Sequence, residues 1–420
     1  MFLNNNIIKK NNRDNFFQYF GVFLLGIYPA TFFLGTGALN SAVILLDIIF
    51  IIELLRTKDL KFLNCFPFYS LIIFWFLLLI NLLFFSIDFI NSAPRSIGFI
   101  RFILFIFAIN YFLDLDNQKY KKIILGSWCL IFIITTFDLI FEFTIGNNIL
   151  GFISYMPGRL AGFFNDELIM GHYFYGFILI IISFLYQNLK DSDFKKIIKL
   201  NNKNLIYFFI ILFLIVSILI GERANFIRTL IMVSIFVFFL NDYKIKKKLI
   251  IILSATILFF IIVFNHQDYK VRFMGQFIAP FVKDPMSYIT SSSYWDHYKV
   301  GIDIFNKNKS FGVGLKNYRV YTEDKNYHNP SIHPHQIQIE ILSELGITGY
   351  ISLLLVLILN IYKSIKSVDF SQNLLNLSGL LFIVTFFLPL LPTGSFFTSH
   401  AATLFWMNFA LILHSKRKNI

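Results

Sequence analysis

Two histidines separated by one residue, His333 and His335, are the side chains of this chain best suited to proton transfer. The apolar spacing that follows them predicts a helix up to Leu345, with Pro334 as its first residue and His335 in its first turn. A helix N-terminus disfavours a protonated imidazole, so His335 is expected to stay neutral and able to accept a proton. The sequence therefore offers His335 as a general base, with His333 in support.

Two other interpretations of the pair stay open. A histidine at a helix start can be a capping or buried structural residue. The pair could also bind zinc, but a zinc site needs a third and a fourth ligand at set spacing, and only His297, His328 and scattered carboxylates are available. We predict a site without a metal and without a cofactor.

Arginine dominates the predicted outer ends of the apolar segments. Outside one long polar segment, the basic residues there are Arg95, Arg101, Arg159, Arg223 and Arg228, with no lysine. A planar guanidinium grips phosphate at two points and stays charged in a low-dielectric site. Taken singly, each arginine is explained by an ion pair, such as Arg223 with Glu222, or by snorkelling to the membrane surface. Taken together they predict an anionic ligand, with Arg223 as the leading contact and Arg159 and Arg228 next.

Composition places these residues in a membrane protein. The chain has 420 residues, of which 57% are hydrophobic and 15% charged, and its mean hydropathy is +0.68. A soluble domain is nearer a quarter charged. The net charge of +13 would suggest a nucleic-acid partner in a soluble protein, but here most lysines lie in short segments between apolar runs, so no nucleic acid is expected.

The apolar runs predict an all-α integral membrane protein with about twelve transmembrane helices, since a span needs roughly 20 apolar residues. The predicted spans are 16–37, 38–55, 66–86, 95–114, 122–142, 167–187, 205–221, 225–240, 249–265, 347–364, 373–392 and 400–414. The whole of 1–420 forms a single polytopic domain. The first run, 16–37, is expected to be an anchor and not a removed signal peptide, because no small-residue cleavage site follows it.

Charge fixes the predicted orientation. The lysine-rich segments fall on one side of the predicted spans, which the positive-inside rule makes cytoplasmic, together with both termini. The long polar segment between spans nine and ten, 266–346, then lies outside and carries the His-x-His element. Its aromatic residues, from Tyr294 to Tyr298, argue against disorder and predict a partly helical loop.

Five short motifs occur in a fixed order along the chain. They are Arg159-Leu160-x-Gly162-Phe163, Gly221-Glu222-Arg223-Ala224-Asn225, Phe311-Gly312-Val313-Gly314, His333-x-His335 and Glu344-Leu345-Gly346-Ile347-Thr348-Gly349. Gly312-Val313-Gly314 is a poor phosphate loop, because no Lys-Ser/Thr follows it, and is expected to be a turn. With this order, and with its topology, the chain resembles the O-antigen ligase and polymerase superfamily of bacterial envelopes.

The resemblance implies a metal-independent, inverting glycosyltransferase of the bacterial inner membrane, with its active site on the periplasmic side. The donor would be a glycan on undecaprenyl diphosphate. The acceptor would be the lipid A-core sugar in a ligase, which we favour, or a second lipid-linked glycan in a polymerase. It also implies that His335 takes the proton of the acceptor hydroxyl and that arginines hold the departing diphosphate.

The chain departs from the family pattern at two places. Gln336 follows the second histidine where the family usually has Asn, and Ser291–Ser293 stand where an arginine often precedes the loop's tryptophan helix. Arg272 is a candidate to replace that arginine at the diphosphate. An alternative from another class, a transporter or flippase for an anionic solute, would favour an inverted repeat, and we find no such repeat.

Overall fold

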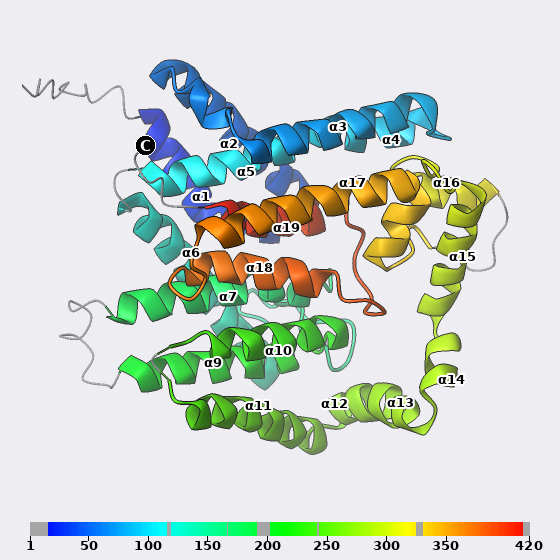
Figure 1. The fold of residues 1–420 in the computed structure, drawn as a ribbon. Helices are drawn as coiled ribbons and strands as arrows, with labels where there is room; N and C mark the ends of the chain where they lie inside the picture. Colours follow the sequence, from blue (N-terminus) through cyan, green and yellow to red (C-terminus); the bar gives the residue numbers. More distant parts are fainter. Residues whose placement is uncertain are drawn as a thin grey trace, which may run out of the picture.

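The computed structural model describes residues 16–115, 119–165, 167–190, 202–241, 243–324 and 331–414. Within these ranges all regular structure is helical, as predicted. The long helices run side by side as a bundle, and a set of short helices crosses one end of it (Figure 1). His328, considered above as a zinc ligand, lies outside the described residues.

The bundle is built from helices that begin and end close to the predicted spans. They are α1 (Phe16–Thr31), α2 (Gly35–Thr57), α3 (Phe66–Phe84), α4 (Phe89–Gly98), α5 (Ile100–Asp114), α6 (Lys119–Ile145), α7 (Met170–Lys190), α9 (Asn202–Leu219), α10 (Arg223–Phe238), α11 (Ile245–Asn265), α17 (Ile337–Ser367), α18 (Leu374–Phe386) and α19 (Ser399–Leu413). Short 3₁₀ turns join some of them at Phe32–Leu34, Leu60–Leu63 and Gly162–Phe164.

Seven helical segments in the described part of the chain are long and apolar enough to cross a membrane. They are Phe16–Thr57, Phe66–Phe84, Phe89–Asp114, Lys119–Ile145, Met170–Asn188, Ile245–Asn265 and Ile337–Ser367. Three shorter apolar helices lie at Asn204–Leu219, Leu374–Phe386 and Ser399–Leu413. The protein is therefore a polytopic membrane protein, while the total of twelve spans stays a prediction.

Two predicted spans differ from the observed helices. The range 95–114 is divided between α4 and α5, which meet at Phe99. The range 373–392 is helical only to Phe386, because Pro389 and Pro392 lack the backbone N–H that a helix needs. The residues after Phe386 form a loop instead, and this loop lines the cavity described below.

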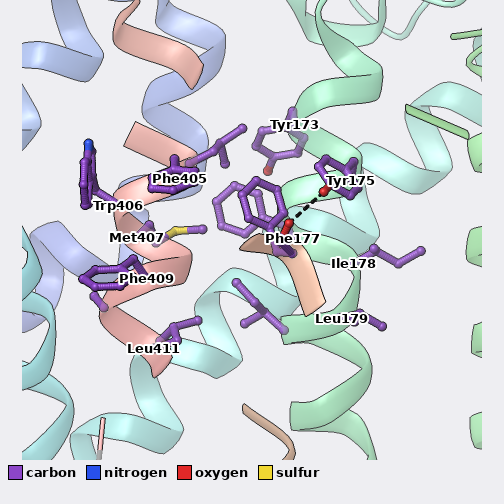
Figure 2. Packing of buried hydrophobic residues seen from close by; sticks show 14 of the residues in the cluster. Tyr173, Tyr175, Phe177, Ile178, Leu179, Phe405, Trp406, Met407, Phe409 and Leu411 are labelled. Atoms are coloured by element: carbon purple, nitrogen blue, oxygen red, sulfur yellow. Dashed lines mark hydrogen bonds between the residues drawn. The ribbon is translucent and has the colours of Figure 1, made fainter. Parts of the chain in front are cut away.

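Aromatic packing between α7 and α19 forms the centre of the bundle. Figure 2 shows the buried side chains of these two helices, with Tyr173, Tyr175 and Phe177 on α7 and Phe405 and Trp406 on α19. The Tyr175 hydroxyl donates to the Phe382 carbonyl, 2.9 Å away on α18, so the buried polar group is satisfied. α19 also packs against α5 and α18. The cavity opens beyond one end of this core.

The predicted outer segment 266–346 is largely helical. It contains α12 (Gln267–Tyr269), a π-helix at Lys270–Ile278, α13 (Ala279–Lys283), α14 (Pro285–Thr290), α15 (Ser293–Lys307) and α16 (Asn317–Asp324). Figure 1 shows α14 and α15 running across the end of the bundle from α13 to α16. α17 is continuous except at Gly346, whose φ of 67° separates the short first part of the helix from its long apolar part.

Candidate active site

A cavity of about 800 Å³ lies between the end of the bundle and the short helices that cross it. Its walls include Arg159, Arg223, Arg272, His333 and His335, five of the six residues predicted from the sequence to form the site. The wall nearest the helix bundle is more apolar than the wall with the arginines, and it is formed by Phe32, Phe164, Tyr173, Ala401 and Leu404. The sixth predicted residue, Arg228, does not line the cavity.

The helix that follows the histidines begins later than predicted. α17 starts at Ile337, and the Gln336 side chain caps it by accepting a hydrogen bond of 2.9 Å from the Ile339 N–H. His335 has a φ of +56°, which a residue inside a right-handed helix cannot adopt. The expectation that Pro334 is the first helical residue and His335 part of the first turn was therefore wrong.

The His335 ring lies among other rings and one hydroxyl. Its Nε2 is 3.1 Å from the Ser331 hydroxyl, and its ring centre is 4.0 Å from that of His333, 5.4 Å from that of His297 and 5.5 Å from that of Tyr294. Burial, and then the neighbouring His297, lowers the pKa of His335 to about 4. The direction agrees with the expectation from the sequence, but the cause is burial and not a helix N-terminus.

His333 is the more buried partner of the pair. Both its ring nitrogens are buried and make no hydrogen bond with the described part of the chain. Burial, followed by His335 and Lys316, lowers the pKa of His333 to about 3. Both imidazoles are consequently neutral at pH 7, the form that can accept a proton.

Three guanidinium groups meet at the opposite wall of the cavity. Arg159 forms an ion pair with Glu222 (Nη2 to Oε1, 2.5 Å), Arg272 Nε donates to the Gly221 carbonyl at 2.7 Å, and Arg223 Nη1 donates to the Gln276 carbonyl at 3.2 Å. Burial, and then the charges of Arg159 and Arg223, lowers the pKa of Arg272 to about 10, so this group remains a cation at neutral pH. Arg223 and Arg272 form no ion pair within the described ranges.

Close backbone contacts bring these arginines together. The turn at Gly221 packs against the loop at Gly158, and a Cβ on Gly221 would lie 1.9 Å from the Gly158 carbonyl oxygen. Gly221 also has a φ of +74°, a region that side chains rarely adopt. The Leu160 N–H donates to the Ile220 carbonyl at 3.2 Å. Two motifs more than 60 residues apart in the sequence thus form one wall.

Arg228 is buried outside the cavity and holds one of the loops that line it. Its side chain is only 2% exposed, and it donates to the carbonyls of Leu391 and Pro392, each at 3.0 Å. The adjacent Thr393 N–H donates to the His335 carbonyl at 2.8 Å. Arg228 therefore holds the loop that holds the base, which differs from the diphosphate contact predicted for it.

The glycines at 312–314 pack closely against α17 near Gly346. Val313 and Gly314 donate backbone hydrogen bonds to the carbonyls of Ser343 and Glu344, at 3.1 and 2.8 Å. A Cβ on Gly312 would lie 2.4 Å from the Glu344 carbonyl carbon, and one on Gly346 would lie 2.4 Å from the Ser310 carbonyl oxygen. The predicted turn at Gly312–Gly314 thus packs on the first part of α17.

Three polar groups near the histidines and arginines were absent from the predicted site, although His297 was considered as a zinc ligand. Tyr294 and His297 face His335 from α15, and their i, i+3 spacing was the available signal. Glu222 was considered only as a partner of Arg223, whereas it pairs with Arg159 and accepts a hydrogen bond of 2.5 Å from Asn225. The contact with Arg159 joins residues 63 positions apart and could not be read from local sequence, whereas Asn225 lies only three residues from Glu222.

Comparison with known families matches this region of the chain. Residues 208–354 match the O-antigen ligase family. The match includes His333, His335, Arg223 and Arg272, while Arg159 precedes it. No curated protein matches the chain. The chain is therefore a polytopic membrane protein that carries an O-antigen ligase domain at residues 208–354.

Proposed function

We propose that the protein transfers a glycan from undecaprenyl diphosphate to an acceptor sugar hydroxyl at the periplasmic face of the bacterial inner membrane. The observation that carries this proposal is the single cavity that holds two neutral histidines opposite three arginines. A general base and a set of diphosphate donors are the two components that glycosyl transfer from a lipid diphosphate needs.

In the proposed reaction, His335 takes the proton of the acceptor hydroxyl. The hydroxyl oxygen then forms a bond to the anomeric carbon of the donor glycan, and the bond from that carbon to the diphosphate oxygen breaks. Attack from the face opposite the leaving group inverts the anomeric configuration. Undecaprenyl diphosphate leaves with an additional negative charge.

The arginines stabilise that charge in the proposed site. Arg223 and Arg272 carry no carboxylate partner in the described residues, and Arg159 shares one carboxylate, Glu222. Three cations against the two carboxylates that line the cavity, Glu167 and Glu222, leave an excess of positive charge for a diphosphate. Because a guanidinium can donate two hydrogen bonds to phosphate, no metal ion is needed in this scheme.

We favour a ligase, whose acceptor is the lipid A-core, over a polymerase, whose acceptor is a second lipid-linked glycan. One compact element, Ser331–Gln336, carries the base together with Ser331 and His333, which supports a single acceptor position. The two functions share the donor and the chemistry and differ only in the acceptor.

The test is glycan transfer by the purified protein from an undecaprenyl-diphosphate-linked glycan, with lipid A-core or a second lipid-linked glycan as acceptor. His335→Ala should reduce the rate roughly 10²- to 10⁴-fold, while binding of the donor changes little. His333→Ala should be milder, because His333 only supports the base. A chelator should leave the rate unchanged.

Full activity of His335→Ala would remove the base assignment. Loss of activity with chelator, restored by zinc, would revive the histidine metal site. Transfer to the lipid-linked glycan but not to lipid A-core would establish the polymerase alternative.

A further inference from the structure

A second group of basic side chains lies on the other side of the histidine pair and has no part in the mechanism above. It consists of Arg95 on α4, Lys316 before α16 and Arg319 on α16. Arg101, at the start of α5, lies within electrostatic range of Arg95. We call Arg95, Lys316 and Arg319 the second basic cluster.

Backbone and side-chain contacts bring these three residues together. Arg319 Nη2 donates to Asn91 Oδ1 at 2.7 Å, and Asn91 precedes Arg95 by one helical turn on the same face of α4. The Ser92 hydroxyl donates to the Leu315 carbonyl at 2.5 Å, which places Lys316 against the same helix. The cluster is thus a folded arrangement of two segments more than 200 residues apart.

The cations of this cluster are half-buried. The carboxylates in electrostatic range of them, Glu344, Glu340 and Asp88, form no ion pair with them in the described part of the chain. Arg95 and Lys316 form no side-chain hydrogen bond or ion pair with any other described residue. The carboxylate within electrostatic range of both is that of Glu344. Half-buried cations without paired anions are costly in an empty site and are expected where an anionic ligand binds.

The cluster is near the histidines but separate from the first set of arginines. Lys316 is close enough to His333 to help lower the pKa of that imidazole. Tyr318, next to Arg319, donates to the His297 carbonyl at 3.2 Å. Figure 1 shows α4 and α16 at one edge of the outer end of the bundle and α12 and α13 at the other, with α14 and α15 running between them. α15 has 15 residues and is therefore roughly 22 Å long, more than one diphosphate can span.

We propose that Arg95, Lys316 and Arg319 bind the phosphate groups of the acceptor lipid, on the opposite side of the histidine pair from the donor diphosphate. This inference rests on the proposed function, since it assigns the acceptor side of the same reaction. The phosphate belongs either to a sugar of a phosphorylated core glycolipid or to the diphosphate of a second lipid-linked glycan.

The competing explanation is that the cluster only balances buried carboxylates. Glu344 is 2% exposed, and its Oε2 has no hydrogen-bond partner among the described residues. In that case Arg95 would neutralise Glu344 and hold α4 against α17. Neutralising Arg95 would then destabilise the protein and affect every substrate alike. A phosphate site predicts an effect on one substrate only.

The experiment uses the purified full-length protein and two pairs of acceptors. One pair is lipid A-core and its dephosphorylated form; the other is a diphosphate-linked glycan and the neutral alkyl glycoside of the same glycan. Arg95→Gln and Lys316→Gln should each raise the KM at least tenfold for whichever phosphate-bearing acceptor the protein glycosylates. A tenfold change corresponds to about 1.4 kcal/mol of binding free energy. The KM should change less than about threefold for the neutral counterpart of that acceptor, and the donor KM should stay the same.

Lys299→Gln is the matched control, because Lys299 lies on α15 outside both basic clusters and its side chain is 58% exposed. It should change neither KM. If Arg95→Gln fails to fold, Arg95→Lys keeps the charge but loses the planar fork, and it should show the same selective rise at smaller size. An unchanged acceptor KM, or an equal rise for the neutral acceptor, overturns the proposal.

Direct binding separates this proposal from the proposed function. Calorimetric titration with inorganic pyrophosphate should show two sites in the wild-type protein, one lost in Arg223→Gln and the other in Arg95→Gln. Absence of transfer to every acceptor would refute the glycosyltransferase assignment while leaving the two-site result intact. A titration in which Arg95→Gln keeps both sites would refute the second site, whatever the enzyme activity.

Discussion

The protonation state of His335 sets the pH range over which the protein should transfer glycans. Burial lowers the pKa of His335 to about 4, and the base works only when neutral. Because the folded pKa is depressed, activity should be retained above this value and lost as the pH falls through about 4. A histidine with the ordinary pKa of about 6.5 would lose activity at a much higher pH.

The difference is largest at moderately acid pH. At pH 5.5, a base with a pKa of about 4 is roughly 97% neutral, whereas a base with a pKa of about 6.5 is roughly 9% neutral. The structure thus predicts about tenfold more activity at pH 5.5 than an exposed histidine would give. Burial lowers the pKa of His335 more than His297 does. His297→Asn should therefore raise the pKa of His335, and the pH at which activity is half lost, only slightly.

The assay is kcat/KM for glycan transfer between pH 4 and 9, which reports the ionisation of the free enzyme. Samples returned to pH 7 must recover full activity, so that unfolding is not read as titration. The residual activity of His335→Ala should lack the acid limb. A half-maximal rate near pH 6.5, or the same limb in His335→Ala, would refute the argument that a buried His335 is the base.

Three further predictions test the arginine wall and the topology. Glu222→Gln removes the carboxylate that pairs with Arg159. Pyrophosphate should then bind about tenfold more tightly by calorimetry, because a charge-assisted hydrogen bond contributes ~1.5–3 kcal/mol. Weaker binding would show that Glu222 orients Arg159 instead. Gly221→Ala places a Cβ where the φ is +74° and the facing loop is 1.9 Å away, and transfer should fall roughly 10²-fold, whereas Gly37→Ala, with open space around it, should match wild type. Met286→Cys, at a position 71% exposed on α14, should react with an impermeant maleimide from outside the cell in a variant without native cysteines; labelling only after the cytoplasm is opened would reverse the orientation.

Much of the helical framework could be predicted from apolar run length. Each of the twelve predicted ranges overlaps an observed helix, because an apolar run of this length must satisfy its backbone hydrogen bonds internally. The break at Gly346 was also predicted as the end of the outer segment. The end that was wrong at 392 lies beside Pro389 and Pro392, where a helix can stop without a loss of hydropathy.

The partners within the site could not be predicted, because they depend on contacts between distant segments. The distribution of lysines along the sequence was enough to predict that the arginines and histidines of the site lie on one side of the membrane. Which arginine faces the cavity depends on the loop at Leu391 and Pro392, whose carbonyls hold Arg228 away from it. No pattern near Arg228 records those acceptors.

The position of His335 also depends on a contact between segments that are far apart in the sequence. His335 does not lie in the first turn of the helix that follows it. It is held by its own left-handed φ, by the Thr393 N–H on its carbonyl and by the Gln336 cap on α17. Two segments, the stretch at His335–Gln336 and the loop at Thr393, therefore determine where the imidazole lies between the two basic clusters. Since an error of about 1 Å in placing a catalytic group can cost roughly 10²-fold in rate, residues that never touch substrate, Arg228 first among them, should control the rate of transfer nearly as strongly as the residues that do.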